Sequence, residues 1–546
     1  MSLELGTAAP MPKRLSIEAA CWVFVVLIAA LLRWSHATAP LDEREAAQAL
    51  RVLVALRAPD EPLSGATSLA QVASFALLGS SEFAARLPAL IAGTLLVLIP
   101  LTLRPALGRA GALAFGALAA FSPTLTFAAR HAEAAIVAWS IALLAFALAA
   151  RGRTRSAAAA LGITLATGPE GAPAALVALV AALFAGARFD QTALPVAGLS
   201  FILTATASLS RWVGLGESFN ALAATLHTTA TLSTARLLAG FVLYEPLAWV
   251  STLASFAWML AQRRWAPLAP SWLVWLSGGI GLSLLRPTLG SALPLAIGAL
   301  GLASVSYAAF AERLSEEEPA LLATAGLAAL ALGYAALGLR QLASTQALGW
   351  ATTPLVSAAL LLLILAFGGL SFSYASLLRA TALPAVGFLL VYSLAVNTQL
   401  NLTRVNNAAE PYRAEAPTEG LSALTRTLQT LSLRATGMPN ALRLHYASDA
   451  PATLRWALRD WRTASAREAQ AWLTPADAQP EATREQIGHG FTLTQRTALH
   501  TLTCPSLEQC GALMRWIVFR DAPATQASRW VLWIDSDLAL RTSGYR

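Results

Sequence analysis

Long, nearly charge-free runs of Leu, Ala, Val and Ile recur along this chain up to about residue 397. Each run is close to the roughly 20 residues that a helix needs to cross a bilayer. Only 12% of the residues are charged, whereas a soluble domain carries about 25%. Most of the surface must therefore face lipid, and the sequence predicts an α-helical polytopic membrane protein.

The number and direction of the membrane segments follow from the same runs. We expect about 11–13 transmembrane helices, at 18–33, 84–103, 109–126, 133–150, 156–167, 173–187, 193–210, 236–261, 270–285, 291–310, 319–338, 351–370 and 380–397. A cytoplasmic N-terminus places one set of loop arginines on the same side, as the positive-inside rule predicts: Arg104, Arg109, Arg151, Arg153, Arg155, Arg188, Arg263, Arg264, Arg313 and Arg379. We expect a multi-pass protein of the plasma membrane without a cleaved signal peptide.

The composition changes near residue 398, where polar residues become frequent. We therefore expect a membrane domain over 1–397, with a first outer loop at 34–83, and a soluble extracytoplasmic α/β domain over 398–546. Predicted strands lie at 442–447, 468–473, 490–495 and 529–534, and predicted helices at 418–432, 450–464 and 506–518. Cys504 and Cys510 form either a disulfide or two thiols. The net charge of +8 comes from scattered loop arginines, which does not indicate nucleic-acid binding.

Asp42 and Glu43 form an acidic corner directly after the first apolar segment. Carboxylates close to a bilayer are costly to desolvate, which favours a functional role. The alternative is a solvated pair that opens an amphipathic helix, because acids favour helix N-termini. Of the two residues, we expect Asp42 to act and Glu43 to be its helix-capping neighbour.

Several short motifs follow this corner in a fixed order. They read DEREAA (42–47), GSSEFAARLP (79–88), FSP (121–123), ARHAE (129–133), LYEPLA (243–248), LRP (285–287), LPLAIG (293–298) and WALRD (456–460). Their order and spacing resemble the GT-C glycosyltransferases of the protein-mannosyltransferase and aminoarabinose-transferase type. The last four stretches are most similar to the prokaryotic flippase-activity-associated GT-C family.

This resemblance implies a hexosyltransferase that moves a sugar from a polyprenyl-phosphate donor to an acceptor at the outer face, with inversion. The acceptor is a protein, a lipid or a glycan. Asp42 matches the catalytic acid of the first loop, with Glu43 beside it, and would act as a base or as a ligand of Mg²⁺ or Mn²⁺. The remaining candidates for substrate binding are Arg86, Arg130, Glu133, Glu245 and Arg286.

The sequence departs from the family pattern at three places. Glu133 stands where an aspartate is expected, Arg286 replaces a lysine, and the histidine that often precedes the acidic pair is displaced to His36. Arginine at position 286 is chemically acceptable, because its guanidinium holds phosphate in bidentate fashion. His131 and Glu133, two residues apart, do not share a helix face, so we expect a polar turn there rather than a metal site.

Two candidates have structural alternatives. Arg86 is expected to pair with Asp42 or Glu43, and Glu245, inside an apolar segment, with a partner such as Arg236 or with a cavity. Two other functions also remain open. A flippase for a lipid-linked substrate would use the same cavity without a base, and a catalytically inactive scaffold would bury Asp42 away from any cavity.

Overall fold

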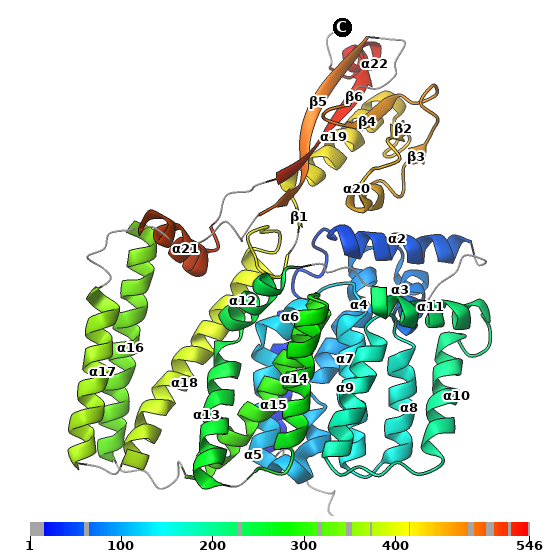
Figure 1. Cartoon of the computed structure of the whole chain (residues 1–546). Helices are drawn as coiled ribbons and strands as arrows, with labels where there is room; N and C mark the ends of the chain where they lie inside the picture. The colour runs from blue at the N-terminus through cyan, green and yellow to red at the C-terminus, as the bar shows by residue number, and fades with distance from the viewer. Residues whose placement is uncertain are drawn as a thin grey trace, which may run out of the picture.

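The chain forms a bundle of helices that carries a smaller mixed domain at one end (Figure 1). This computed structural model describes residues 16–58, 65–227, 232–263, 265–313, 319–345, 352–371, 374–413, 415–478, 485–497, 507–521 and 526–543. The prediction for Cys504 and Cys510 concerns side chains outside the described part. The fold class expected from the apolar runs, a polytopic helical protein with a C-terminal α/β domain, is confirmed.

In the described ranges, the bundle comprises 18 α-helices and a short π-helix. In chain order they are α1 (Ile17–Trp34), α2 (Glu43–Arg57), α3 (Ala66–Leu78), α4 (Glu82–Leu96), α5 (Pro100–Phe121), α6 (Pro123–Ala129), α7 (Ala135–Ala150), α8 (Thr154–Leu165), α9 (Gly171–Phe184), α10 (Ala193–Ala205), α11 (Val213–His227), α12 (Thr234–Tyr244), α13 (Pro246–Gln262), α14 (Ala269–Leu285), α15 (Leu289–Arg313), α16 (Pro319–Thr345), α17 (Thr352–Ser371), α18 (Tyr374–Thr398) and η3 (Gln399–Thr403).

Five stretches of the described chain are long and apolar enough to cross a membrane, and a bent pair brings the number to six. They are Ile17–Trp34, Glu82–Phe121, Leu289–Tyr307, Thr324–Thr345 and Ala380–Thr403, with α12 and α13 as the bent pair. Shorter apolar helices of 10–17 residues lie between them. The protein is thus a multi-pass membrane protein, and the larger number of 11–13 transmembrane helices stays a prediction.

The single segment expected at 236–261 is wrong, because the chain bends by 82° between α12 and α13. Pro246 begins α13 and lacks the N–H that would continue α12, and Glu245 has non-helical backbone angles. A similar break inside α5 falls at Gly108, whose φ of 73° is readily adopted only by glycine. The break at Gly108 falls in the gap expected between the segments 84–103 and 109–126, whereas the bend at Pro246 was not indicated by the apolar run.

The loops that were expected to share one side do lie together. The turns from α7 to α8, from α9 to α10 and from α13 to α14 lie at the end of the bundle opposite the C-terminal domain (Figure 1). At the start of α1, Glu18 pairs with Arg104 at 2.9 Å and with Arg109 at 3.5 Å. This grouping agrees with the positive-inside pattern, and which end faces the cytoplasm stays a prediction.

The C-terminal domain is a six-stranded sheet in the order β1-β5-β6-β4-β2-β3. Strands β2, β3 and β4 run parallel, while β6 with β4 and β5, and β5 with β1, are antiparallel. The strands are β1 (Ala416–Pro417), β2 (Arg443–Tyr446), β3 (Arg462–Thr463), β4 (Ala471–Pro475), β5 (Gln486–Arg496) and β6 (Gln526–Asp535), and the helices are α19 (Glu419–Thr436), α20 (Ala452–Ala457), α21 (Leu507–Phe519) and α22 (Ser536–Ser543).

The secondary structure expected for this domain is largely confirmed. The four predicted strands overlap β2, β4, β5 and β6, and two predicted helices overlap α19 and α21. The helix expected at 450–464 is too long, because the chain leaves α20 at Ala457 and enters β3 beside β2. There Ala464 donates its N–H to the Leu444 carbonyl at 2.9 Å.

Arg236 of α12 fixes the joint between the bundle and this domain. Its guanidinium donates to the carbonyls of five residues, four of them in the turn that leaves η3: Ala408, Glu410, Pro411, Arg413 and, in the domain itself, Thr497. Buried backbone carbonyls that are not bonded within a helix or a sheet need a hydrogen-bond donor from another part of the protein. The turn at 408–413 is therefore held rigidly against α12.

Large aromatic side chains fill the centre of the bundle. Trp139, Trp272 and Trp275 are fully buried, and the ring of Trp272 lies 5.2 Å from that of Phe115 and 5.1 Å from that of Phe146, centroid to centroid. Edge-on contacts of this kind stabilise more than area alone. The close approach of α14 to α15 depends on glycine at the contact.

Gly301→Ala should destabilise the bundle, because the new Cβ would lie 2.3 Å from the Trp272 ring. Overpacking of this kind costs about 1–3 kcal/mol. Gly281→Ala is the matched control, since nothing lies within 4 Å of its Cβ position and alanine favours a helix by about 1 kcal/mol. Thermal unfolding of the purified protein measures both, and equal midpoints for the two variants would contradict this packing.

Candidate functional site

Asp42 is the N-cap of α2 and forms a reciprocal capping box with Glu45. Its Oδ1 accepts the N–H groups of Arg44 at 3.0 Å and Glu45 at 2.9 Å, and the Glu45 Oε2 accepts the N–H of Asp42 at 3.0 Å. The residue order allows this, because an acid at the N-cap followed three positions later by glutamate is a helix-start signal. The expectation that Glu43 caps α2 is wrong, since Asp42 does so itself and keeps its other oxygen, Oδ2, for another contact.

Arg86 and Glu45 form a buried ion pair directly behind Asp42. The Nε and Nη2 of Arg86 donate to the two carboxylate oxygens of Glu45 at 2.8 and 2.7 Å. The remaining donors of Arg86 bind the carbonyls of Ala37, Ala39 and Pro40. The pairing partner expected for Arg86 was Asp42 or Glu43, which is wrong. All its N–H groups are used within the protein, which favours a structural role over substrate binding.

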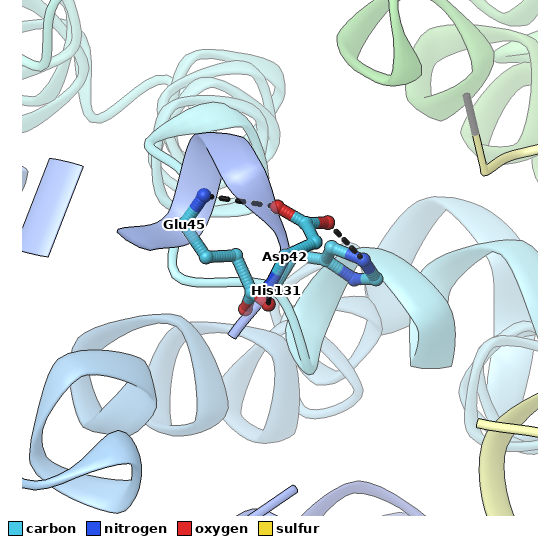
Figure 2. Close-up of side chains that lie close together, drawn as sticks. All are labelled: Asp42, Glu45 and His131. Atoms are coloured by element: carbon cyan, nitrogen blue, oxygen red, sulfur yellow. Dashed lines mark hydrogen bonds and ion pairs between the residues drawn. The ribbon is translucent and has the colours of Figure 1, made fainter. Parts of the chain in front are cut away.

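His131 meets Asp42 from the turn after α6. Figure 2 shows the Asp42 carboxylate between the backbone N of Glu45 and the His131 ring. The His131 Nε2 lies 3.4 Å from Oδ2 of Asp42, and its Nδ1 lies 2.8 Å from the Phe127 carbonyl. A carbonyl only accepts, so Nδ1 carries a hydrogen. In a neutral ring Nε2 would then direct a lone pair at the carboxylate, so the contact is attractive only with a cation between them, either a proton or a metal ion.

Two acids at this site, Asp42 and Glu133, differ in their pKa. Burial alone would raise the pKa of Asp42, but the hydrogen bond and charge of His131 outweigh it and hold that pKa well below its ordinary value. Burial, followed by the negative charge of Asp42, raises the pKa of Glu133 to about 7. Asp42 is therefore ionised at neutral pH, whereas Glu133 holds its proton more strongly than an ordinary glutamate.

A cavity of about 200 Å³ opens at this corner. The charged and polar residues that line it are Asp42, Glu43, Arg44, His131, Glu133, Tyr412, Arg413, Glu415 and Arg496. Asp42 is 17% exposed, so its carboxylate is reachable from the cavity. Three predicted site residues, Asp42, Glu43 and Glu133, thus line one cavity.

The donor atoms at this corner fit a divalent cation. Asp42, Glu45 and His131 place ligand atoms within 4.8 Å of one another. Glu45 already accepts four N–H groups, from Arg86, Asp42 and the backbone of Ala132. The Oδ2 of Asp42 and the Nε2 of His131, which lie 3.4 Å apart, remain available to an ion. A set of one oxygen and one nitrogen ligand suits Mn²⁺ or Zn²⁺ better than Mg²⁺.

Glu43 binds the C-terminal domain. Its carboxylate accepts the N–H of Ala452 at 2.6 Å, the N–H of Thr453 at 3.1 Å and the Thr453 hydroxyl at 3.1 Å. These N–H groups begin α20 and have no partner within that helix. The second acid of the corner therefore fastens the domain over the site.

The WALRD motif completes this contact. The Trp456 ring stacks on Phe75, with centroids 5.9 Å apart, and its Nε1 donates to Glu82 at 3.1 Å. Arg459 donates to the Ser80 carbonyl at 3.0 Å and lies over the Trp456 ring. Two motifs that lie far apart in the sequence, 79–88 and 456–460, thus form one interface.

Glu245 and Arg286 do not line this cavity. Glu245 accepts hydrogen bonds from the Ser122 hydroxyl and from the Thr124 N–H at 2.9 Å, so its expected pairing with Arg236 is wrong. Arg286 lies 4.0 Å from Glu170 at the end of α14. Their roles in substrate binding stay predictions.

Two residues at the site were not recognised from the sequence. His131 was assigned to a polar turn, because its partner Asp42 lies on a distant part of the chain. Arg413 lies in the non-periodic turn after η3, where no motif marks it. The only signal was a charged residue beside Tyr412 just after the last apolar helix.

Glu45→Gln should destabilise the fold strongly, because Arg86 would be left buried without its carboxylate. Breaking a buried pair from one side costs about 3–5 kcal/mol. The double variant Glu45→Met with Arg86→Met should lose less stability than Glu45→Met alone. Chemical unfolding in detergent measures these variants together with Arg86→Met, and a double variant as unstable as the sum of the two methionine single variants would refute the coupling.

Glu43→Gln should loosen the C-terminal domain without unfolding either part. Hydrogen bonds to a charged acceptor contribute about 1.5–3 kcal/mol, so the Ala452 and Thr453 amides should exchange roughly tenfold faster or more. Glu419→Gln is the control, since Glu419 is exposed. Hydrogen exchange followed by mass spectrometry reports both, and unchanged protection of α20 in Glu43→Gln would argue against docking through this carboxylate.

No protein-family model matches the chain, and no curated protein does. Among solved structures, the chain is similar to ArnT from Cupriavidus metallidurans in the apo state, with 16% identity, 84% of this chain and 94% of that chain covered, and a TM-score of 0.47. The same protein bound to undecaprenyl phosphate gives a TM-score of 0.48 at the same identity and coverage.

The chain is also similar to the apo oligosaccharyltransferase of Archaeoglobus fulgidus, with 12% identity, 83% of this chain and 65% of that chain covered, and a TM-score of 0.45.

Proposed function

We propose that the chain is a membrane glycosyltransferase that takes a sugar from a polyprenyl-phosphate donor and transfers it to an acceptor hydroxyl at the outer face of the plasma membrane. The observation that carries this proposal is the position of Asp42. Its Oδ1 is used to cap α2, while Oδ2 faces His131 beside the cavity. This carboxylate is ionised and borders the cavity, so a hydroxyl bound there can come within hydrogen-bond reach of it.

An apolar groove supports a lipid-linked donor. A cavity of about 640 Å³ lies between α3, α4 and α7, lined almost wholly by apolar side chains such as Leu95 and Ile99. Its lining includes Pro88, two residues after Arg86. It also includes Ala70 and Ser74, which lie before and after Gln71 in α3. Gln71 in turn donates to the Ala132 carbonyl next to His131. An isoprenoid chain in this groove would bring its phosphate towards the acidic corner.

The proposed reaction is a single displacement. The acceptor oxygen attacks the anomeric carbon as its proton passes to Asp42, and the bond from that carbon to the donor phosphate oxygen breaks. The polyprenyl phosphate leaves with the electron pair of that bond. Attack from the side opposite the leaving group inverts the anomeric configuration.

A divalent cation is the alternative use of the same atoms. Asp42 and His131 would hold it, with Glu133 on the wall of the same cavity. Such a cation would neutralise charge on the donor phosphate. In that case Asp42 would help to hold the ion, and Glu133 would be a carboxylate on the same wall that could accept the proton.

The position of Asp42 also bears on the alternative of an inactive scaffold. That alternative requires Asp42 to be buried against Arg86 with no cavity beside it. Instead, Arg86 is paired with Glu45, and Asp42 lines the cavity. A flippase would not need an ionised carboxylate capped and aligned beside an imidazole.

Asp42→Asn should abolish sugar transfer while leaving the fold intact. Asparagine caps a helix about as well as aspartate, so α2 should persist, whereas loss of a general base lowers the rate by roughly 100-fold or more. Transfer from polyprenyl-phosphate-linked sugars to membrane acceptors measures activity, and the thermal midpoint measures folding.

Asp190→Asn is the matched control, because Asp190 lies between α9 and α10 at the opposite end of the bundle. Normal transfer by Asp42→Asn would rule out the proposal. Lipid scrambling in liposomes that persists without an acceptor, together with no transfer by the wild type, would establish the flippase instead.

A further inference from the structure

Two buried arginines meet beside the acidic corner without a carboxylate partner. Arg130 ends α6 and is 6% exposed, and Arg413 lies after η3 and is 8% exposed. Both line a small pocket together with Arg86, Phe127, His131 and Asn401. Within the described part of the chain, neither guanidinium has an acidic oxygen within 4.0 Å.

Each of these arginines also has a buried donor without an acceptor. The Nη1 of Arg130 and the Nε of Arg413 are shielded from solvent and make no hydrogen bond in the described structure. A buried charged donor without a partner costs more than 1–3 kcal/mol, roughly the range for a neutral group. Arg413 is compensated only in part by the Phe127 ring, 5.2 Å from its guanidinium carbon.

The acids closest to these arginines are engaged with other groups. Glu45 is paired with Arg86, and Asp42 faces His131. Glu410 accepts from the Tyr244 hydroxyl and lies 3.6 Å from Arg520. Glu133 and Glu415 share the cavity wall with Arg413, but within the described part of the chain neither forms an ion pair with it, so guanidinium donors remain that suit a phosphate oxygen.

Arg413 lines two neighbouring spaces, one of which contains Asp42. It lines both the small pocket of about 10 Å³ and the cavity of about 200 Å³ that contains Asp42. The small pocket holds no more than about one water, so a larger anion must occupy the cavity and reach Arg413 there. Arg130, which lines the small pocket alone, contributes its charge from behind.

The backbone around Arg413 is fixed before any ligand binds. Arg236 donates to the carbonyls of the 408–413 turn, including that of Arg413. The adjoining Tyr412 hydroxyl lies 3.1 Å from Thr124 Oγ1, a residue of α6. Because the backbone that carries Arg413 is already fixed, less freedom is lost when a ligand binds its guanidinium, which favours affinity.

We propose that Arg413, supported by Arg130, binds the phosphate group of the substrate in the cavity beside Asp42. Arg286, the phosphate contact expected from the sequence, lies beside Glu170 and does not line that cavity. Only the identity of the phosphate as that of a lipid-linked sugar rests on the proposed function. As the bond to the sugar breaks, the phosphate gains negative charge, which Arg413 is placed to stabilise.

The test is binding of two probes, farnesyl phosphate and inorganic phosphate, to the full-length protein in detergent. Arg413→Gln should weaken binding of farnesyl phosphate by roughly 10- to 100-fold. Arg413→Lys should lose part of that, because lysine keeps the charge but not the planar fork. Arg155→Gln, at the opposite end of the bundle, is the control. Unchanged binding by Arg413→Gln, or a loss confined to Arg286→Gln, overturns the assignment.

The two probes and two further variants keep the outcomes distinct. Tighter binding of farnesyl phosphate than of inorganic phosphate indicates a lipid headgroup, and equal binding indicates free phosphate. If Arg413→Gln fails to fold, Arg413→Lys decides, and wild-type affinity in that variant overturns the inference. Asp42→Asn should retain or tighten binding, since it removes a nearby negative charge. Transfer activity in Asp42→Asn alongside weak binding in Arg413→Gln would reject the enzyme and keep the anion site.

Discussion

The buried pair of Arg86 and Glu45 is the interaction on which the rest of this site depends. Glu45 accepts N–H groups from α4, from its own helix start and from Ala132, while Arg86 holds the carbonyls of the turn that precedes α2. Because charge and hydrogen bonds are satisfied together, the desolvation of both ions is offset. The pair fixes α2, α4 and the turn that carries His131 relative to one another, and it leaves Asp42 free to face the cavity.

A run of four residues thus supplies three different functions. Asp42 caps α2 and faces His131, Glu43 holds the C-terminal domain, and Glu45 pairs with Arg86. Asp42 lies outside the helix as its N-cap, whereas Glu43 begins the helix, so these two neighbouring carboxylates have different partners. The acidic corner is better understood as three separate contacts than as one catalytic pair.

The sequence was sufficient for what depends on composition and period, and insufficient for what depends on distant partners. Apolar runs predicted the helices, and alternation predicted β2, β4, β5 and β6. The bend at Pro246, the partner of Glu245 and the contact of Asp42 with His131 were not predictable, because each is set by residues more than 80 positions away or by local backbone chemistry. Arg413 lies in an irregular turn whose shape is imposed by Arg236 of α12, and no periodic pattern marks such a residue.

The C-terminal domain bears on the site through two separate attachments. At one end, the start of α20 donates a hydrogen bond to Glu43, the residue after Asp42. At the other end, Arg413 lies in the turn from η3 to β1 and forms part of the cavity wall. A displacement of the domain would therefore move a neighbour of the base and the proposed phosphate contact together. Since Arg236 and Glu43 resist such displacement from different helices of the bundle, the domain acts as a part of the site and not as an appendage. The proposed base and the proposed phosphate contact are therefore in place together only when the domain is docked on the bundle.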